Sequence, residues 1–136
     1  MTDTSSINEV TEAPIPQAPA KLTTREILVG AKALLVDKGW TQRDYARGAD
    51  GYYSDEEGAS CFCGWGALLA SAVPGDMFSR EAFKASAAPL KALEAVLGEG
   101  SPRWVPFNDT PGRTLPEVLE VFDRAIAACG PEEVAA

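Results

Sequence analysis

Two short segments carry the residue types most suited to chemistry, and the first is Cys61-Phe62-Cys63-Gly64-Trp65-Gly66. A thiol at the start of a helix becomes a nucleophile when the helix dipole lowers its pKa. A papain-like cysteine also needs a histidine base, and the sequence contains no histidine. Cys61, Cys63 and the distant Cys129 lack the paired Cys-x-x-Cys spacing of structural zinc sites. We therefore expect the cysteines to pack in the hydrophobic core.

The second segment, residues 104–114, combines aromatic and polar side chains. Trp104 and Phe107 are expected to anchor it to the core, and Pro111-Gly112 suits a type II turn. Two interpretations of its polar residues stay open. In one, Asn108 and Asp109 close the loop on backbone N–H groups; in the other, they form a binding cluster with Arg113. Arg113 is also placed to pair with Asp109.

A third candidate is the acidic loop near Asp50. Aligned on an EF-hand loop, Asp50, Gly51 and Glu57 match positions 5, 6 and 12, but positions 1 and 3 are Ala46 and Gly48. Those two residues offer no side-chain oxygen to calcium. The loop is therefore predicted to be a solvated surface rather than an EF-hand.

Composition narrows the possible functions. The 136 residues include 12 Lys and Arg, 20 Asp and Glu and no histidine, and the net charge is −8. Without histidine there is no Ser-His-Asp triad and no His-ligated zinc or haem, and no cofactor fingerprint is present. Nucleic acids are bound through Lys and Arg, so direct binding to them is not expected. The chain has no membrane-length apolar stretch, and its three cysteines without a secretory signal favour the cytoplasm.

The elements that position these residues are predicted to be helices. Residues 1–21, rich in Pro, Thr and Ser, are expected to form a disordered N-terminal tail. A helix over 24–38 follows the capping box of Thr23 and Glu26, and an apolar helix over 62–73 is the most buried one. Pro89 divides 80–97 into two short helices or kinks it.

The last helix begins after the capping box of Thr114 and Glu117 and runs to about Ala128. The sequence thus predicts a mostly α, compact single domain over 22–130, with four or five helices and a C-terminal tail at 131–136. Its long irregular loops leave room for a small hairpin near 45–60, in which Tyr52 and Tyr53 start an edge strand.

We also predict that the irregular loops 40–58 and 104–113 lie side by side over the start of the helix that contains Gly64 and Gly66. These two glycines mark places where another backbone comes close. An aromatic cluster beneath the loops is expected to consist of Trp40, Trp65, Trp104 and Phe107.

The order of motifs resembles an uncharacterised family of small actinobacterial and phage proteins, a domain of unknown function. The resemblance covers about Ile27 to Ala127 and rests on Leu34-Leu35-x-x-x-Gly39-Trp40-Thr41-Gln42, Cys63-x-x-Gly66-Ala67-Leu68 and Asn108-Asp109-x-x-Gly112-Arg113-Thr114-x-x-Glu117-Val118-Leu119. Phe107 stands where the family commonly has Trp, and Cys61 is not one of its usual features. The resemblance implies a helical cytosolic fold and no assigned activity.

These observations favour a small acidic, non-enzymatic module that interacts with a protein, such as a host protein if the source is a phage. An acidic mimic of nucleic acid is a variant of this hypothesis. No catalytic or metal-ligating residue is assigned, and the candidate binding residues are Asn108, Asp109, Arg113, Asp50, Trp40 and Trp104. The alternative is a protein that binds a small molecule or divalent metal, or an unrecognised hydrolase, using Asp50, Asp55, Asp109 and Arg113.

Overall fold

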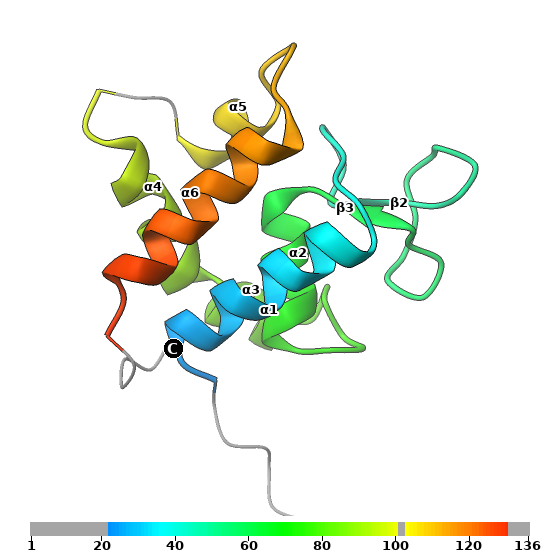
Figure 1. Cartoon of the computed structure of the whole chain (residues 1–136). Coiled ribbons are helices and arrows are strands. Elements are labelled where there is room, and N and C mark those ends of the chain that lie inside the picture. Colours follow the sequence, from blue (N-terminus) through cyan, green and yellow to red (C-terminus); the bar gives the residue numbers. More distant parts are fainter. Residues whose placement is uncertain (1–21, 101–102, 131–136) are drawn as a thin grey trace, which may run out of the picture.

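The computed structural model describes residues 22–100 and 103–130, and the expected tails at 1–21 and 131–136 lie outside them. The elements of the described residues are, in order, α1 (Thr24–Asp37), β2 (Ala46–Arg47), β3 (Cys61–Phe62), α2 (Gly64–Ala72), α3 (Arg80–Ala85), α4 (Ala87–Leu97), α5 (Trp104–Asn108) and α6 (Leu115–Ala128). The predicted mostly α fold with a small hairpin is confirmed (Figure 1). No helix in the described part of the chain is long and apolar enough to cross a membrane.

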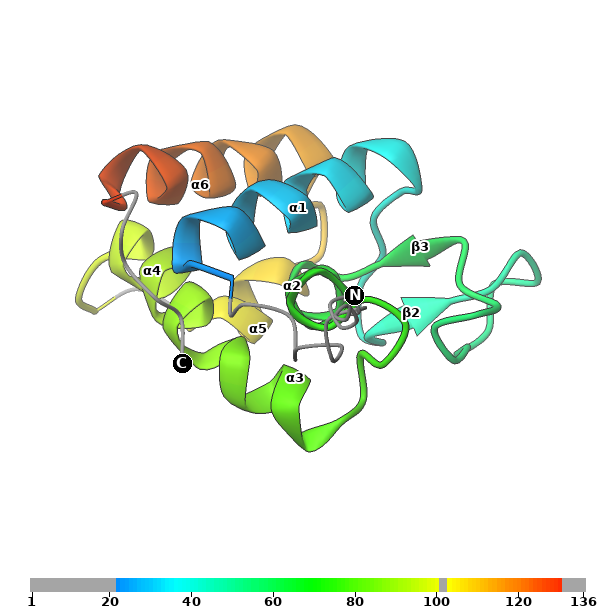
Figure 2. The ribbon, with the colours of Figure 1, turned by 90° about the horizontal axis from the view of Figure 1, so that it is seen from below.

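Helix α2 occupies the centre of the fold. Figure 2 shows it end-on, with α1 and α6 on one side and α3, α4 and α5 on the other. Seven of its nine residues are buried. A helix that is apolar all round must be covered on every side, and the predicted central helix is confirmed.

Helices α1 and α6 form a layer over one side of α2. Each begins with the predicted capping box, Thr23 with Glu26 and Thr114 with Glu117. In both boxes the two side chains bond to each other's backbone N–H groups, which the first turn of a helix leaves unpaired. The core between the layers includes fully buried Leu28, Leu68 and Phe122.

The break between α3 and α4 resolves the alternatives at Pro89. Two separate helices form, and Pro89 is the third residue of α4. In the first turn its missing N–H removes no intrahelical hydrogen bond. Ser86 ends α3 and precedes α4, and its Oγ donates to the carbonyl oxygen of Phe83 at 2.9 Å.

The hairpin pairs β2 with β3 in antiparallel register, with Ala46 opposite Phe62 and Arg47 opposite Cys61. Tyr53 forms only an isolated bridge to Arg47, so the predicted edge strand at 52–53 does not form. The acidic loop between β2 and β3 is fastened to another part of the fold. The carboxylate of Glu56 accepts hydrogen bonds from the backbone N–H groups of Gly75 and Met77, both 2.7 Å, which ties this loop to the α2–α3 connection.

Helix α5 lies in a segment that the sequence analysis treated as a loop, and that prediction was wrong. The short helix has no side-chain cap of its own at Arg103. Instead Glu94 of α4 accepts a hydrogen bond from the backbone N–H of Trp104 at 3.0 Å. A carboxylate from a neighbouring helix thus replaces the local cap, and sequence spacing alone gives no sign of it.

Candidate functional site

The side chain of Asn108, at the end of α5, joins three segments of the chain. Its Oδ1 accepts hydrogen bonds from Trp40 Nε1 at 2.8 Å and Gly64 N at 3.1 Å. Its Nδ2 donates to Thr41 O at 3.3 Å and Asp109 Oδ1 at 2.9 Å. The amide is 2% exposed and all four of its hydrogen-bonding positions are filled. The prediction that the two irregular segments meet over the start of α2 is confirmed.

Asp109 supports an uncommon backbone conformation in the facing segment. Its Oδ1 accepts a hydrogen bond from Arg43 N at 2.9 Å. Arg43 has a φ of 78°, the only positive value at a non-glycine residue in the described ranges. The left-handed conformation costs an L-residue about 1–2 kcal/mol. These contacts support the interpretation of Asp109 as a residue that holds the loops together.

Gly64 and Gly66 mark the close approaches that the sequence predicts. A Cβ at Gly64 would lie 2.7 Å from Nε1 of Trp104, whose ring packs directly on this backbone. A Cβ at Gly66 would collide with the carbonyl oxygen of Tyr45 and lie 2.8 Å from its carbonyl carbon. Only glycine allows α5 and the segment before β2 to reach the start of α2.

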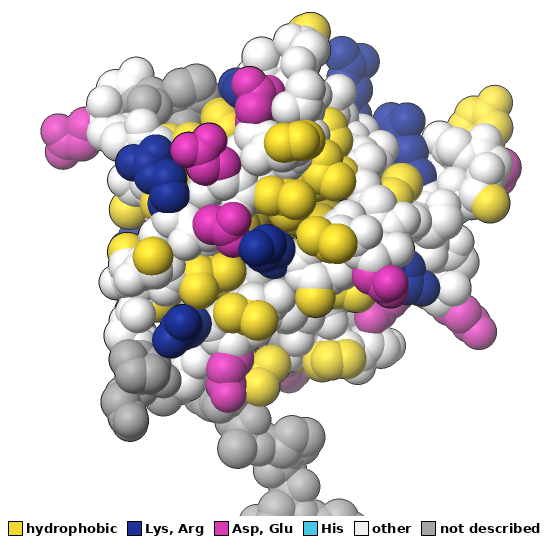
Figure 3. Space-filling model, viewed as in Figure 1, with side chains coloured by type: hydrophobic (Ala, Val, Ile, Leu, Met, Phe, Trp, Pro, Cys, Tyr) yellow, Lys and Arg dark blue, Asp and Glu magenta, His cyan; other side chains and the backbone are white. Residues whose placement is uncertain are grey.

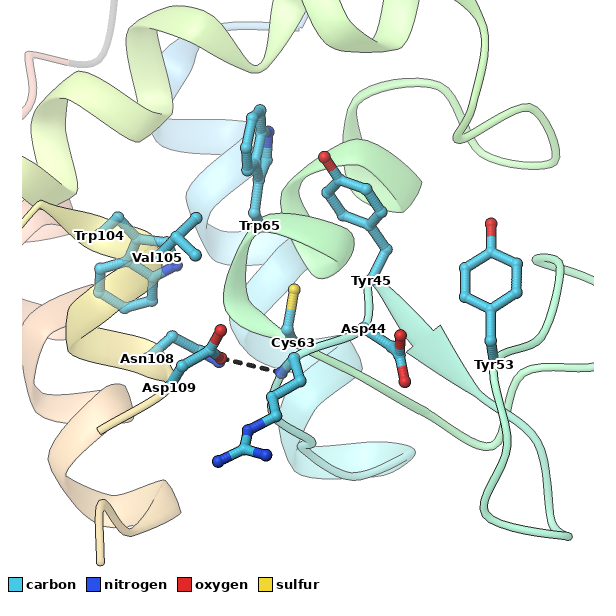
Figure 4. Close-up of a pocket in the computed structure, with 10 residues that line it drawn as sticks. Asp44, Tyr45, Tyr53, Cys63, Trp65, Trp104, Val105, Asn108 and Asp109 are labelled. Atoms are coloured by element: carbon cyan, nitrogen blue, oxygen red, sulfur yellow. Dashed lines mark hydrogen bonds between the residues drawn. The ribbon is translucent and has the colours of Figure 1, made fainter. Parts of the chain in front are cut away.

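A cavity of about 390 Å³ lies where these segments meet (Figure 4). Its walls combine aromatic rings with a few polar groups, the composition typical of ligand-binding cavities. The lining residues come from the segment around β2, the start of α2 and α5: Arg43, Asp44, Tyr45, Tyr53, Cys63, Trp65, Trp104, Val105, Asn108 and Asp109.

Aromatic rings continue from the cavity onto the protein surface. The ring of Tyr45 packs against those of Trp65, Phe78 and Phe83, with centroid distances of 5.4, 5.9 and 6.0 Å. Tyr53 lies 6.3 Å from Phe78. The exposed fractions are 59% for Tyr53 and 37% for both phenylalanines. We call these five residues the aromatic surface.

The predicted single aromatic cluster is divided into two. Trp104 packs against Phe107 and, edge to face, against Phe122, at centroid distances of 5.3 and 5.7 Å, whereas Trp65 belongs to the aromatic surface. Successive residues of a helix point about 100° apart. Trp65 therefore leaves α2 on a different side from Gly64, on which Trp104 packs.

Cys63 is the N-cap residue of α2 and lines the cavity instead of packing in the core. Its Sγ accepts a hydrogen bond from Gly66 N at 3.2 Å. Burial raises the pKa of its thiol to about 11, and the carboxylates of Asp109 and Asp44 raise it as well. The thiol is therefore protonated at neutral pH, which makes it a poor nucleophile.

We expect Cys63 to react with iodoacetamide about 100-fold more slowly in the folded protein than in urea at pH 8, because only the thiolate reacts. The measurement is timed labelling of a Cys61→Ser variant followed by peptide mass spectrometry. The raised pKa also means that the stability linked to this thiol is complete below about pH 9 and is lost as the pH rises through 11. Equal labelling rates in the two states would contradict the raised pKa.

The remaining candidate residues lie apart from the cavity lining. Asp50 and Asp55 accept hydrogen bonds within their own turns, from Tyr52 N at 3.0 Å and Gly58 N at 2.9 Å. Trp40 lines a neighbouring depression formed by residues 40–43 and Arg47. Thus Asn108, Asp109 and Trp104 reach the cavity, whereas Trp40 and Asp50 do not line it.

Arg113 does not form the expected ion pair with Asp109. Its Nε donates to Phe107 O at 3.0 Å, and its guanidinium lies over the Phe107 ring, 3.8 Å from the centroid. Nη1 is 3.6 Å from Oε1 of Glu117. Arg113 therefore fastens the turn between α5 and α6 and is not a cavity residue.

Sequence reasoning missed Asp44, Tyr45 and the two surface phenylalanines, Phe78 and Phe83. Tyr45 lies in a segment without hydrophobic periodicity, so the sequence gives no indication of the direction in which its ring points. The only available signal was the presence of large aromatic residues outside the predicted apolar stripes, at 45, 52–53 and 78.

The arrangement is suited to binding. Aromatic faces, two carboxylates and an indole N–H surround the cavity, and its only thiol is held protonated. Within residues 22–100 and 103–130, no group of three or more His, Cys, Asp or Glu side chains is placed to hold a metal ion.

Comparison with known protein families gives one match. Residues 19–128, which include every helix and strand from α1 to α6, match the family described as "Family of unknown function (DUF6197)". No curated protein and no solved structure matches the chain.

Proposed function

The chain belongs to this family of unknown function, as its motifs suggested, and we propose that it is a non-enzymatic module that binds a partner protein through the aromatic surface. The observation that carries the proposal is the exposure of Tyr53, Phe78 and Phe83 around a cavity. Contiguous exposed apolar residues mark interaction sites, and aromatic side chains dominate the binding energy of many interfaces.

On the face formed by α1 and α6, the distribution of charge gives no support to mimicry of nucleic acid. Figure 3 shows Asp and Glu side chains interspersed with Lys and Arg over α1 and α6, so this face has no continuous acidic surface. One such neighbouring pair is Lys32 and Asp123, whose charged atoms are 2.6 Å apart. A mimic of the phosphate backbone needs acidic groups gathered on one face.

The cellular setting is part of the proposal. The odd number of cysteines suits a reducing compartment, so we place the module in the cytoplasm. The resemblance noted above suggests an actinobacterium or a phage as its source, and a host protein is then the partner of a phage-encoded chain.

A double substitution tests the proposal. We expect Tyr53→Ser/Phe78→Ser to reduce capture of the partner from a lysate of the source organism by at least about tenfold, because it removes exposed aromatic contact area. The matched control is Val36→Ser, which removes an exposed apolar side chain, 61% exposed, from α1. Capture is quantified by mass spectrometry, with the melting temperature of each variant measured in parallel.

The same captured protein should remain with the control and the unchanged chain. Equal capture by the double variant and the control would show that the aromatic surface is not the binding surface. Loss with Val36→Ser alone would move the interface to α1.

A further inference from the structure

The cavity within the aromatic surface has walls suited to a positive charge. The rings of Tyr45 and Trp65 are nearly perpendicular, with an interplanar angle of 76°, and make a corner of two π systems. Tyr53 and Trp104 line other parts of the wall (Figure 4). The faces of aromatic rings carry partial negative charge, and they attract ammonium and guanidinium groups.

Two carboxylates add formal negative charge to this wall. Figure 4 shows Asp44 and Asp109 on either side of Cys63. Asp44 Oδ2 forms an ion pair with Arg47, accepting from its Nε at 2.8 Å, and Asp109 Oδ1 accepts from Arg43 N. Arg43 is the one positively charged residue among those that line the cavity, which leaves the lining with two carboxylates to one guanidinium. The hydrogen bonds that these two carboxylates accept from the described residues use one oxygen of each, Oδ2 of Asp44 and Oδ1 of Asp109. Each carboxylate can therefore accept a hydrogen bond from an incoming cation.

The negative charges of Asp44 and Asp109 act on Cys63, which lines the cavity. Burial contributes most to the raised pKa of Cys63, and the charges of Asp109 and Asp44 contribute in the same direction. Carboxylates that disfavour an anion at the Cys63 sulfur favour a cation at the same place.

We propose that this cavity receives a lysine or arginine side chain of the partner protein, between the rings of Tyr45 and Trp65 and the carboxylates of Asp44 and Asp109. The inference rests on the proposed function and names the chemistry of the partner. The net charge of −8 complements a basic partner segment and would speed its encounter with this surface.

Short peptides that differ only in charge provide the test. The peptide Gly-Gly-Arg-Gly-Gly is titrated into the full-length protein, and the indole N–H signals of Trp65 and Trp104 are followed by NMR. We expect saturable shifts with a dissociation constant on the order of 1 mM, and the same for the lysine peptide. The peptide with citrulline, the neutral counterpart of arginine, should produce no saturable shift. Equal shifts with arginine and citrulline, or none with either basic peptide, would overturn the inference.

A pair of charge-matched variants locates the binding site. Asp44→Asn should weaken binding of the arginine peptide about fivefold, because it removes a carboxylate from the cavity wall. Asp123→Asn removes the same unit of charge from α6, outside the cavity lining, and should leave binding unchanged. Equal weakening by both variants would mean that the peptide responds only to net charge.

The inference and the proposed function fail in different ways. If the basic peptides do not bind while partner capture still requires Tyr53 and Phe78, the cation site is wrong and the aromatic surface remains the interface. If the arginine peptide binds as expected while capture ignores those two residues, the cavity recognises cations but the partner docks elsewhere.

Discussion

Replacing Gly66 with alanine is expected to lower the melting temperature by roughly 12 °C, a loss of about 3 kcal/mol in the free energy of unfolding. The added Cβ would meet the carbonyl group of Tyr45, which is backbone. Tyr45 O also accepts a hydrogen bond from Cys63 N at 3.1 Å, so this carbonyl group cannot move away from Gly66 without breaking that hydrogen bond. Relief of the collision would have to displace α2, whose residues make up the centre of the core.

A second glycine supplies the control for thermal unfolding. At Gly130 an added Cβ has no heavy atom within 4 Å and the backbone is not left-handed. Gly130→Ala should therefore change stability by less than about 0.5 kcal/mol. If Gly66→Ala were equally mild, the close contact between α2 and residue 45 would be refuted.

The second large effect is expected for Asn108→Asp, at about 3 kcal/mol near neutral pH. The substitution keeps the shape of the side chain but removes the two donors that reach Thr41 O and Asp109 Oδ1. It also introduces a carboxylate beside that of Asp109, at a position where the native Asn108 is only 2% exposed.

The pH dependence of this variant distinguishes charge from shape. Burial and the neighbouring carboxylate raise the pKa of the introduced group in the folded state above its unfolded value of about 3.9. Its penalty is therefore smallest below about pH 4 and grows as the pH rises through the folded-state pKa. Asn108→Ala, which removes all four side-chain hydrogen bonds without adding a charge, should show a deficit relative to the unchanged protein that varies little with pH. Urea unfolding at several pH values measures both, and parallel pH profiles would contradict the buried position of this amide.

Local features of the fold were predictable because their causes lie within a few residues. The capping boxes at Thr23 and Thr114 each join residues three positions apart, and both form. Pro89 ends up in the first turn of α4 for the same local reason. Helix α5 escaped prediction because Glu94, which caps it, is ten residues away and on another helix.

The candidate site shows the same division. Sequence alone determined that no histidine chemistry operates, that α2 is the buried centre, and that Gly64 and Gly66 mark close approach. The tertiary structure decided that Asn108 bonds Trp40 and Gly64, which are 68 and 44 residues away. It also decided that Tyr45 and Trp65, rather than Trp40, make the cavity corner. Hydrophobic periodicity predicts which side chains of a regular helix or strand point into the core, but residues 40–60 are largely irregular. The directions of their side chains depend on hydrogen bonds and packing with residues distant in the sequence.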